Sequence, residues 1–411
     1  MDHQPRPTGD RGEAPSGGTP SQALSVVMVA GEASGDWAGA RLAGVLGRAR
    51  PDIVLRGVGG QRMATAGVEL LADSSTWGAI GVFEAIPKIP RVWRALRMLR
   101  GLLASAPPSA LVLIDFGAGN IGLARWAQGR HIPTLYYLPP GSWRQRPRSV
   151  EVRDLVDVIA TPFSWSRDLL AGGRARVEWV GHPVVEAARP ELTRDEAWSR
   201  YDLDRNRPVV ALAPGSRQQE MHYLLPTLAE AAARLGSRFP GVQFLVPIAP
   251  SLAQEEVTGL FGRAGVTVVP LAGMDYGALQ LAEAAAVCSG TATLEFTCLG
   301  VPMVVVYRAS RATTLQYRLV RGLIGGQRFA AMPNIIACRQ VVRELLGSAA
   351  SPEAIVQELS GLLSEDGHRE RARSDLALVK ATLGPPSASQ RTAQLLLELI
   401  DRGGQGRGPR G

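Results

Sequence analysis

The feature that most constrains this fold is a short β-branched run that breaks into a glycine-containing turn and then into a helical pattern. Residues 24–30 read LSVVMVA, residues 31–36 read GEASGD, and residues 37–49 read WAGARLAGVLGRA. An apolar run that ends in a tight turn and gives way to helical periodicity is typical of a buried strand followed by a helix. This unit opens a parallel α/β sheet, because parallel strands need helical crossovers between them.

The same alternation continues along the chain and restarts near its middle. The predicted strands are Ile53–Val58, Ala110–Ile114, Thr134–Leu138, Asp157–Ala160, Val177–Val180, Pro208–Ala213, Gln243–Pro247, Val266–Leu271 and Ala285–Cys288. Two consecutive series of this kind predict an α/β protein with two doubly wound, Rossmann-like domains that face a central cleft. In such folds, ligands bind at the carboxyl ends of the strands.

The prolines and lost periodicity of GHPVVEAARPELTR, which begins at residue 181, indicate an interdomain connection. The predicted segments are a disordered leader at 1–22, a first domain at 23–185, a linker at 186–207, a second domain at 208–375, C-terminal helices at 376–402 and a disordered tail at 403–411. The Pro/Gly-rich leader lacks the apolar core of a secretory signal, and no run reaches the roughly 18–20 apolar residues that span a bilayer. We therefore expect a cytoplasmic protein.

Composition and spacing exclude several classes of function. The chain of 411 residues carries 45 basic and 37 acidic side chains, with only 3 Cys and 5 His. Its arginines are dispersed and no aromatic platform interleaves with them, which argues against nucleic-acid binding. No metal-ligand spacing, GxGxxG fingerprint or Walker loop occurs, so we expect neither a metal nor a cofactor. His182, beside the expected hinge, is interpreted as a structural residue.

Three glycine-containing turns stand where predicted strands end and helices begin. They read GEASGD at 31–36, PGSR at 214–217 and SGTATLE at 289–295. Small residues let main-chain amides approach an anion, and the helix dipole favours negative charge there. Arg217 can pair with a phosphate, and Glu295 can accept hydrogen bonds from ribose hydroxyls. The alternative is that these are ordinary capping turns, with a solvated arginine and a helix-stabilising acid.

A basic amphipathic segment at 77–103 gives a different signal. Its apolar side chains cluster on one face at helical spacing, namely Ile89, Val92, Leu96, Leu99 and Leu103. Arginines occupy the remaining faces and an apolar loop precedes the helix. This pattern fits attachment to an anionic membrane surface, with Val82, Phe83, Ile86 and Trp93 facing the lipid. The alternative is a core-facing helix with a solvated arginine face.

Taken together, the motifs resemble those of the lipid-A-disaccharide synthase family. Over about residues 25–400, and in the family's order, they read AGEASGD, RGVGGQRM, WGAIGVFE, VGHP, APGSRQQE, SGTATLE, VPMVVVYR and MPNIIACRQVVRELL. The resemblance implies an inverting, metal-independent GT-B glycosyltransferase. Its reaction would move 2,3-diacylglucosamine from the UDP conjugate to 2,3-diacylglucosamine 1-phosphate, giving a β-1,6-linked disaccharide and UDP.

The resemblance also implies site residues and partners. The UDP-sugar site on the second domain would comprise Arg217, Glu220, Gly290, Thr291, Ala292, Thr293, Glu295 and Asn334. The acceptor side on the first domain would comprise Glu32, Ser34, Gly35, Asp36 and Asn120. The implied partners are the UDP-acyl-sugar donor, the acylated glucosamine phosphate acceptor and an anionic membrane, so the protein would associate peripherally with the inner membrane. The oligomeric state stays open, a homodimer included.

The chain departs from the family pattern at the expected general base. Family members read Ile-Asp-Ala-Pro-Asp-Phe-Asn where this chain reads IDFGAGN at 114–120, so Ala118 replaces the second Asp. We predict that Asp115, the nearest remaining carboxylate, or Glu32 acts as the base. The alternatives are a different acceptor, since the changes lie in the first domain, or a catalytically silent UDP-sugar-binding protein. An epimerase is disfavoured, because few histidines are available as acid–base partners.

Overall fold

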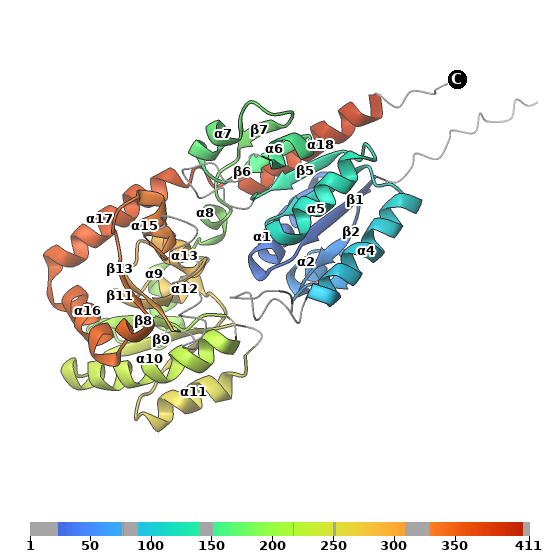
Figure 1. The fold of residues 1–411 in the computed structure, drawn as a ribbon. Coiled ribbons are helices and arrows are strands. Elements are labelled where there is room, and N and C mark those ends of the chain that lie inside the picture. The colour runs from blue at the N-terminus through green and yellow to red at the C-terminus, as the bar shows by residue number, and fades with distance from the viewer. Residues whose placement is uncertain are drawn as a thin grey trace, which may run out of the picture.

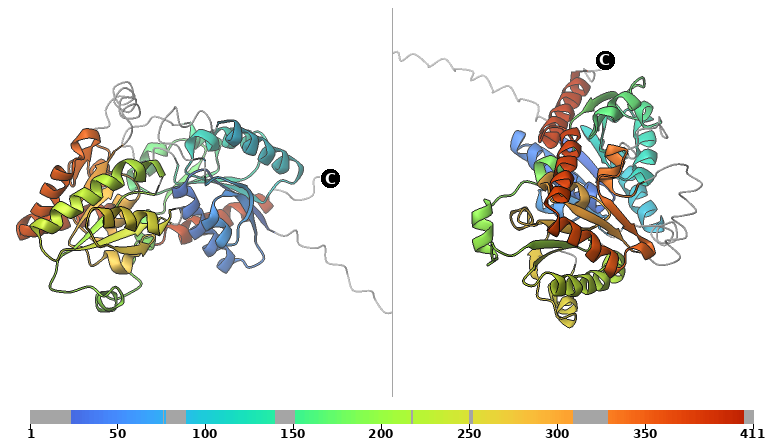
Figure 2. Two further views of the ribbon diagram at one scale, coloured as in Figure 1. Left: turned by 90° about the horizontal axis from the view of Figure 1, so that it is seen from below. Right: turned by 90° about the vertical axis from the view of Figure 1, so that its left-hand side faces the viewer.

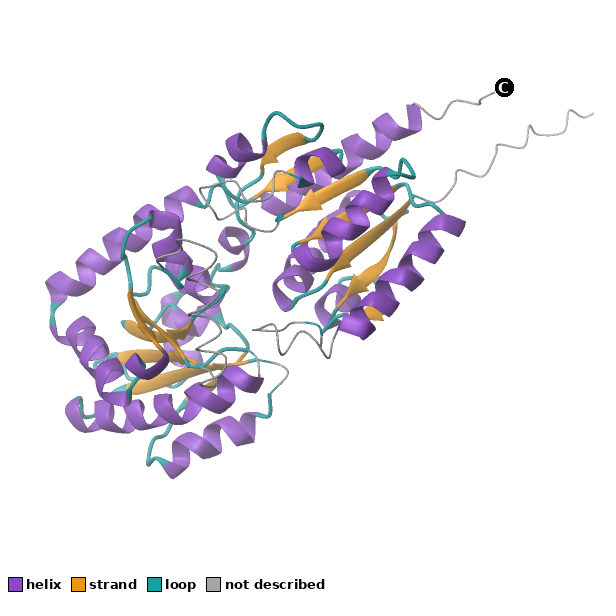
Figure 3. Cartoon of the chain, viewed as in Figure 1, coloured by secondary structure: helices purple, strands orange, loops and turns teal. Residues whose placement is uncertain are grey.

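The computed structural model describes residues 24–75, 77, 89–139, 151–216, 218–249, 252–308 and 329–405. Figure 1 shows two lobes, each built on a parallel sheet, and Figure 3 shows helices packed along both sheets. Each sheet separates two hydrophobic clusters, one on either face. This arrangement confirms the predicted α/β fold with two Rossmann-like halves.

The first lobe holds a seven-stranded sheet in the order β3-β2-β1-β4-β5-β6-β7. Its strands are β1 (Ser25–Ala30), β2 (Val54–Gly59), β3 (Glu69–Asp73), β4 (Ala110–Ile114), β5 (Thr134–Tyr137), β6 (Val158–Thr161) and β7 (Arg176–Trp179). Its helices are α1 (Ala33–Ala49), α2 (Gln61–Thr65), α4 (Ile89–Ser105), α5 (Gly117–Gln128), α6 (Val152–Leu155) and α7 (Ser164–Leu170). The central strands are buried on both faces, which explains their unbroken apolar sequences.

The second lobe holds a six-stranded sheet in the order β10-β9-β8-β11-β12-β13. Its strands are β8 (Val209–Ala213), β9 (Gln243–Ile248), β10 (Val269–Ala272), β11 (Ala284–Cys288), β12 (Met303–Tyr307) and β13 (Arg343–Leu346). Its helices are α10 (Gln218–Arg238), α11 (Gln254–Arg263), α12 (Tyr276–Leu279), α13 (Ala292–Leu299), α15 (Met332–Ala337), the 3₁₀ turn η2 (Gly347–Ala349), α16 (Pro352–Ser364) and α17 (Asp366–Thr382). All of the strand pairs in both sheets are parallel, as the crossover pattern predicts.

The chain crosses between the lobes twice. After β7 it passes through α8 (Val184–Ala187) and α9 (Arg194–Arg200) into the second lobe. It returns after α17, and α18 (Ala388–Gln405) packs on the first sheet through the apolar side chains of its inner face. Figures 1 and 2 show this last helix, in red, lying against the first lobe. The C-terminal helix therefore completes the core of the N-terminal lobe.

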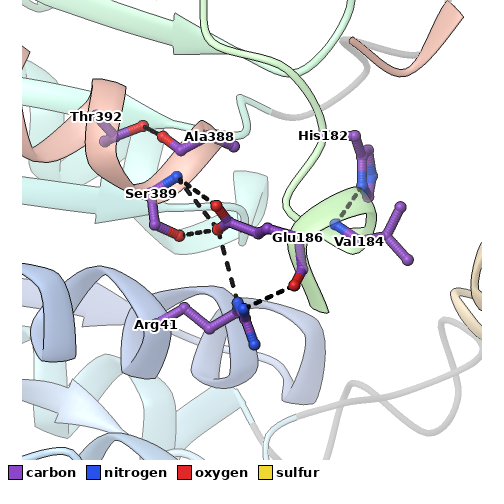
Figure 4. A network of polar contacts seen from close by, with 7 residues as sticks. All are labelled: Arg41, His182, Val184, Glu186, Ala388, Ser389 and Thr392. Atoms are coloured by element: carbon purple, nitrogen blue, oxygen red, sulfur yellow. Dashed lines mark hydrogen bonds and ion pairs between the residues drawn. The ribbon is translucent and has the colours of Figure 1, made fainter. Parts of the chain in front are cut away.

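A buried carboxylate fastens this double crossing (Figure 4). Glu186 of α8 lies 3.6 Å from the Nε of Arg41 on α1, and its carboxylate accepts hydrogen bonds from the main chain and hydroxyl of Ser389 on α18. Arg41 also donates to the main-chain carbonyl of Glu186, over 3.1 Å. The contact joins α1, α8 and α18, three segments far apart in the sequence, and we call it the hinge clasp.

His182 supports the crossing from within the protein. Its main-chain N–H donates to the carbonyl of Leu383 over 2.7 Å, which ties the outgoing segment to the returning one. Its Nδ1 accepts the N–H of Val184, and burial lowers the pKa of His182 to about 4. The ring is therefore neutral at physiological pH, as expected of a structural residue.

Candidate active site

The predicted polar turns gather where the strand order reverses in each sheet. In the first sheet β1 and β4 are neighbours, and the turns at 31–32 and 115–116 follow them. In the second sheet β8 and β11 are neighbours, and the polar segments at 214–217 and 289–291 follow them. At such a reversal, the connections that follow the two neighbouring strands lie on opposite faces of the sheet. This leaves a crevice at the carboxyl ends of the strands, and doubly wound folds bind their ligands there.

A serine–aspartate pair occupies the reversal in the first lobe. Ser34, in the first turn of α1, donates its hydroxyl hydrogen to Oδ2 of Asp115 at the end of β4, over 2.8 Å. The two residues come from motifs far apart in the chain, and both were predicted to belong to the site. Each of the two residues is partly exposed, so a substrate hydroxyl can approach the pair.

Asp115 occupies an unusual backbone conformation that its neighbours stabilise. Its φ angle is +50° and that of Phe116 is +48°, a left-handed region that few non-glycine residues adopt. The Asp115 carbonyl accepts hydrogen bonds from Nδ2 of Asn120 at 3.1 Å and from the hydroxyl of Tyr136 at 2.8 Å. Asn120 is fully buried and also donates to carbonyls of β1 and β4. In this structure Asn120 therefore supports the turn from below.

The surroundings of Asp115 raise its proton affinity. Burial raises the pKa of Asp115 above its ordinary value, against the opposing effects of the hydrogen bonds from Ser34 and from the main chain of Phe116. A carboxylate with a raised pKa is a stronger base, because its proton affinity lies closer to that of the hydroxyl it must deprotonate. Geometry and electrostatics together suit Asp115 to general-base chemistry.

The ring of Phe116 packs against two glycines. A Cβ added at Gly31 would lie 2.1 Å from Cγ of that ring, and one added at Gly119 would lie 2.2 Å from its Cε1. The indole of Trp77 packs against the same ring, with centroids 5.8 Å apart. Only glycine at positions 31 and 119 leaves room for this ring. The packed ring helps to fix the turn that carries Asp115.

Of the remaining residues predicted for the first lobe, Gly35 and Asp36 are buried and Glu32 is partly exposed. Asp36 is buried, and its carboxylate accepts hydrogen bonds from main-chain N–H groups at the start of α2 over 2.7–3.3 Å. Gly35 is buried against β1 and β4. Glu32 is partly exposed at the N-cap of α1. Of the residues predicted for this lobe, Glu32, Ser34 and Asp115 are thus the partly exposed ones.

The turn after β11 leaves an open approach to the start of α13. Gly290 has a φ of +152°, and a Cβ added there would meet no atom of the described residues within 4 Å. Thr291 is exposed and Ala292 begins the helix, whereas Thr293 is buried and its hydroxyl donates to the Gly290 carbonyl over 2.7 Å. The uncovered part of the predicted UDP-sugar loop is therefore residues 290–292.

Glu295 lies one turn further into α13 and is 9% exposed. Its Oε1 accepts a hydrogen bond of 2.9 Å from the hydroxyl of Tyr276, at the start of α12. Burial raises the pKa of Glu295, while the hydrogen bond from Tyr276 and the positive charge of Arg62 oppose that rise. Because Arg62 belongs to α2, a charge from the first lobe acts on this carboxylate of the second lobe.

Two other residues predicted for the donor side, Glu220 and Asn334, stabilise loops by accepting hydrogen bonds from main-chain N–H groups. Glu220 accepts the main-chain N–H of Ser216 over 3.1 Å, which fixes the turn after β8. Asn334 is fully buried, and it accepts main-chain N–H groups at residues 341–342 and donates to Glu344. Arg217 lies outside the described residues.

The membrane-facing prediction is only partly open to inspection. Val82, Phe83 and Ile86 lie outside the described residues. Trp93 on α4 is 60% exposed, and Ile89 is 56% exposed. Of the apolar face predicted from spacing, Val92, Leu96, Leu99 and Leu103 pack on the core of the first lobe, whereas Ile89 at the start of α4 is exposed. Within the described part of the chain, no helix is long and apolar enough to cross a membrane.

Some residues of the site carried no signal in the sequence analysis. Tyr136, Tyr276 and Arg62 join it only through the fold, since no motif distinguishes them from their neighbours in the sequence. Arg62 lies within the RGVGGQRM stretch, whereas Tyr276 follows an unremarked loop after β10. A single tyrosine at the first position of a four-residue helix gives no pattern that distinguishes a functional hydroxyl from a packing ring.

Solved structures with the same architecture define the class of the fold. The chain aligns with UDP-GlcNAc 2-epimerase from Neisseria meningitidis bound to UDP-GlcNAc at a TM-score of 0.60 and 13% identity, covering 91% of this chain and 100% of that one. It aligns with MurG from Acinetobacter baumannii at a TM-score of 0.56 and 13% identity, covering 91% and 99%. At these identities the likeness shows the fold alone, which is the GT-B arrangement of two facing Rossmann-like domains.

Sequence comparison then identifies the family. The family described as lipid-A-disaccharide synthetase matches residues 26–398. The lipid-A-disaccharide synthase of Geobacter sulfurreducens is 37% identical over 378 residues, covering 92% of this chain and 97% of the relative, and that of Myxococcus xanthus is 36% identical over 379 residues, covering 92% and 98%. The chain belongs to the lipid-A-disaccharide synthase family and is a GT-B hexosyltransferase of lipid A biosynthesis.

Proposed function

We propose that this protein transfers 2,3-diacylglucosamine from UDP-2,3-diacylglucosamine to 2,3-diacylglucosamine 1-phosphate, with Asp115 as the general base. The observation that carries the proposal is the Ser34–Asp115 pair, held in a left-handed turn at the strand-order reversal of the first lobe. Sparsely populated backbone conformations cost about 1–3 kcal/mol each and gather at functional sites. The main-chain contacts of Asn120 and Tyr136 to Asp115 offset that cost.

The position of Asp115 compensates for the alanine at 118. The two positions lie at the same junction, because β4 ends at Ile114 and α5 begins at Gly117. Three residues of chain span at most about 11 Å. The ring that family members carry at the position of Gly119 is replaced here by Phe116, which packs against Gly119. The aromatic ring is lost at position 119 and present at position 116, so the turn keeps a ring in its packing. This fits a turn whose residues changed together and kept its function, rather than one that lost its function.

In the proposed reaction the acceptor's 6-hydroxyl oxygen attacks the anomeric carbon of the donor. Asp115 takes the hydroxyl proton, the new glycosidic bond forms with inversion, and the bond to UDP breaks with its electron pair passing to the diphosphate. The Gly290–Thr293 turn and Arg217 would stabilise the charge that develops on that leaving group. Ser34 holds the Asp115 carboxylate through its 2.8 Å hydrogen bond, and Glu32 lies beside the same turn.

Product analysis tests the substrate assignment. Purified protein incubated with both substrates should yield a tetraacylated disaccharide 1-phosphate, detected by mass spectrometry, together with one equivalent of UDP. Equal transfer to an acceptor that lacks the 1-phosphate would contradict the acceptor assignment. Donor binding without any disaccharide would favour a silent UDP-sugar-binding protein.

We also propose that α4 attaches the protein to the anionic surface of the inner membrane. Ile89 and Trp93 project from its first turns, and Arg91, Arg94 and Arg97 are exposed around them. The guanidinium of Arg97 lies 5.2 Å from the centroid of the Trp93 ring. An exposed tryptophan flanked by arginines suits the interface between headgroups and acyl chains. Acylated substrates would enter from the surface that this helix contacts.

A further inference from the structure

Tyr276 approaches Glu295 from a second, independently fixed helix. Its hydroxyl donates to Glu295 Oε1 over 2.9 Å. The position of α12 is set by Asp275, whose side chain accepts the N–H of Ala278 at 3.1 Å and also a hydrogen bond from the hydroxyl of Tyr201. The tyrosine therefore projects from a capped turn.

Apolar packing holds Tyr276 in place from the other side. It contacts a cluster that includes Leu294 and Cys298 of α13 and Val184 of α8, and Trp37 of α1 packs on the same cluster. Ser34, Trp37 and Arg41 recur along α1 at helical spacing, so one face of this helix runs from Asp115 to the hinge clasp. Tyr276 thus lies where that face meets the donor side.

The carboxylate of Glu295 is left with capacity for a ligand. A buried carboxylate must be hydrogen-bonded, and it has about four acceptor positions on its two oxygens. Among the described residues, the hydroxyl of Tyr276 donates a hydrogen bond to this side chain, and it engages Oε1. Burial raises the pKa of Glu295, and the positive charge of Arg62 in the opposite lobe opposes that rise.

We propose that Tyr276 is a positioning residue that orients Glu295 toward the ribose hydroxyls of the donor nucleotide. The tyrosyl hydroxyl fixes one carboxylate oxygen, so the other faces the ligand in a single orientation. The preference of the enzyme for a ribonucleotide over a deoxyribonucleotide then depends on Tyr276, although the tyrosine itself does not touch the ribose. This inference rests on the donor site of the proposed function.

The test compares UDP with 2′,3′-dideoxy-UDP in calorimetric titrations of the full-length protein. Wild type should bind UDP more tightly than the dideoxy analogue. Tyr276→Phe should weaken UDP binding about tenfold, because the Glu295 carboxylate loses the hydrogen bond that orients it, and should weaken analogue binding less than about twofold. Glu295→Gln should likewise abolish most of the discrimination, and the double variant should lose little more than either single variant.

A matched control removes a tyrosyl hydroxyl elsewhere in the same lobe. Tyr223→Phe, on an exposed part of α10, should leave both affinities unchanged. If Tyr276→Phe weakens UDP and the dideoxy analogue equally, Tyr276 supports the fold only and the inference is overturned, with thermal unfolding reporting the structural loss. If wild type fails to bind UDP at all, the proposed donor site is overturned as well.

Discussion

Asp115→Asn is the substitution that isolates the proposed base. Asparagine matches aspartate in shape, and it tolerates the left-handed φ of +50° better than most residues. Its side-chain oxygen can still accept the hydrogen bond from Ser34, so the turn should persist. What the variant loses is the ability to take a proton.

The expected magnitude follows from that single loss. General-base help contributes about 10²–10⁴ in rate, so kcat should fall by about 10³-fold while UDP affinity stays within about twofold. Burial raises the pKa of Asp115 in the folded protein, so ionising this carboxyl costs stability. Stability from this group is therefore full at low pH and is lost as the pH rises from the unfolded value, about 4, through the raised folded value. Asp115→Asn should accordingly unfold at a higher temperature than wild type at pH 8, and the difference should shrink toward pH 4.

The assay is the pH profile of acceptor-dependent UDP release. Wild-type activity should fall as the pH drops through the pKa of Asp115. Ser34→Ala removes a hydrogen bond that favours the ionised form, so the acid limb of its profile should move to higher pH while its plateau changes less. Near-wild-type turnover in Asp115→Asn would refute the assignment, as would an unmoved acid limb in Ser34→Ala.

Three further predictions test the structure around the site. Gly31→Ala should destabilise the protein, because its Cβ would lie 2.1 Å from the Phe116 ring, and adding Phe116→Ala should restore thermal stability; an undisturbed Gly31→Ala variant would refute the packing. Glu186→Gln should lower the free energy of unfolding in urea by about 2–3 kcal/mol, because the hinge clasp is lost. The control Glu69→Gln breaks an exposed pair with Arg56 and should lower it by less than about 1 kcal/mol. Equal losses in the two variants would contradict the stabilising role of the hinge clasp. Ile89→Ser with Trp93→Ser should reduce sedimentation with anionic liposomes, and Leu378→Ser, similarly exposed on α17, should not; unchanged sedimentation of the double variant would exclude α4 as the contact.

Strand prediction succeeded where burial makes the sequence simple. The central strands β1, β4, β8 and β11 are continuous apolar runs, and the predicted strands overlap them closely. β3 and β13 were not predicted as strands; they lie at sheet edges and read ELLAD and RELL. Edge strands are covered on fewer sides, so their sequences carry less apolar signal. β12 is apolar, but its segment was interpreted only as a family motif.

The residues of the candidate site could be predicted only in part, because the sequence does not show which of their side chains are buried. The GEASGD turn at a strand end predicted Ser34, and the departure from the family pattern at residues 114–120 led to Asp115 as the nearest remaining carboxylate. Spacing could not separate exposed polar residues from buried ones, so Asp36, Asn120 and Asn334 were grouped with the substrate contacts, although in this structure their side chains bond mainly to the protein's own main chain. That distinction depends on tertiary packing, which a linear pattern does not encode.

The most direct test of the central claim is UDP release by purified wild-type protein given UDP-2,3-diacylglucosamine, with and without 2,3-diacylglucosamine 1-phosphate. We predict release that depends on the acceptor, which would show that a base other than residue 118 suffices. Binding of the donor with no acceptor-dependent release would contradict the account, because Asp115 would then not replace the missing carboxylate.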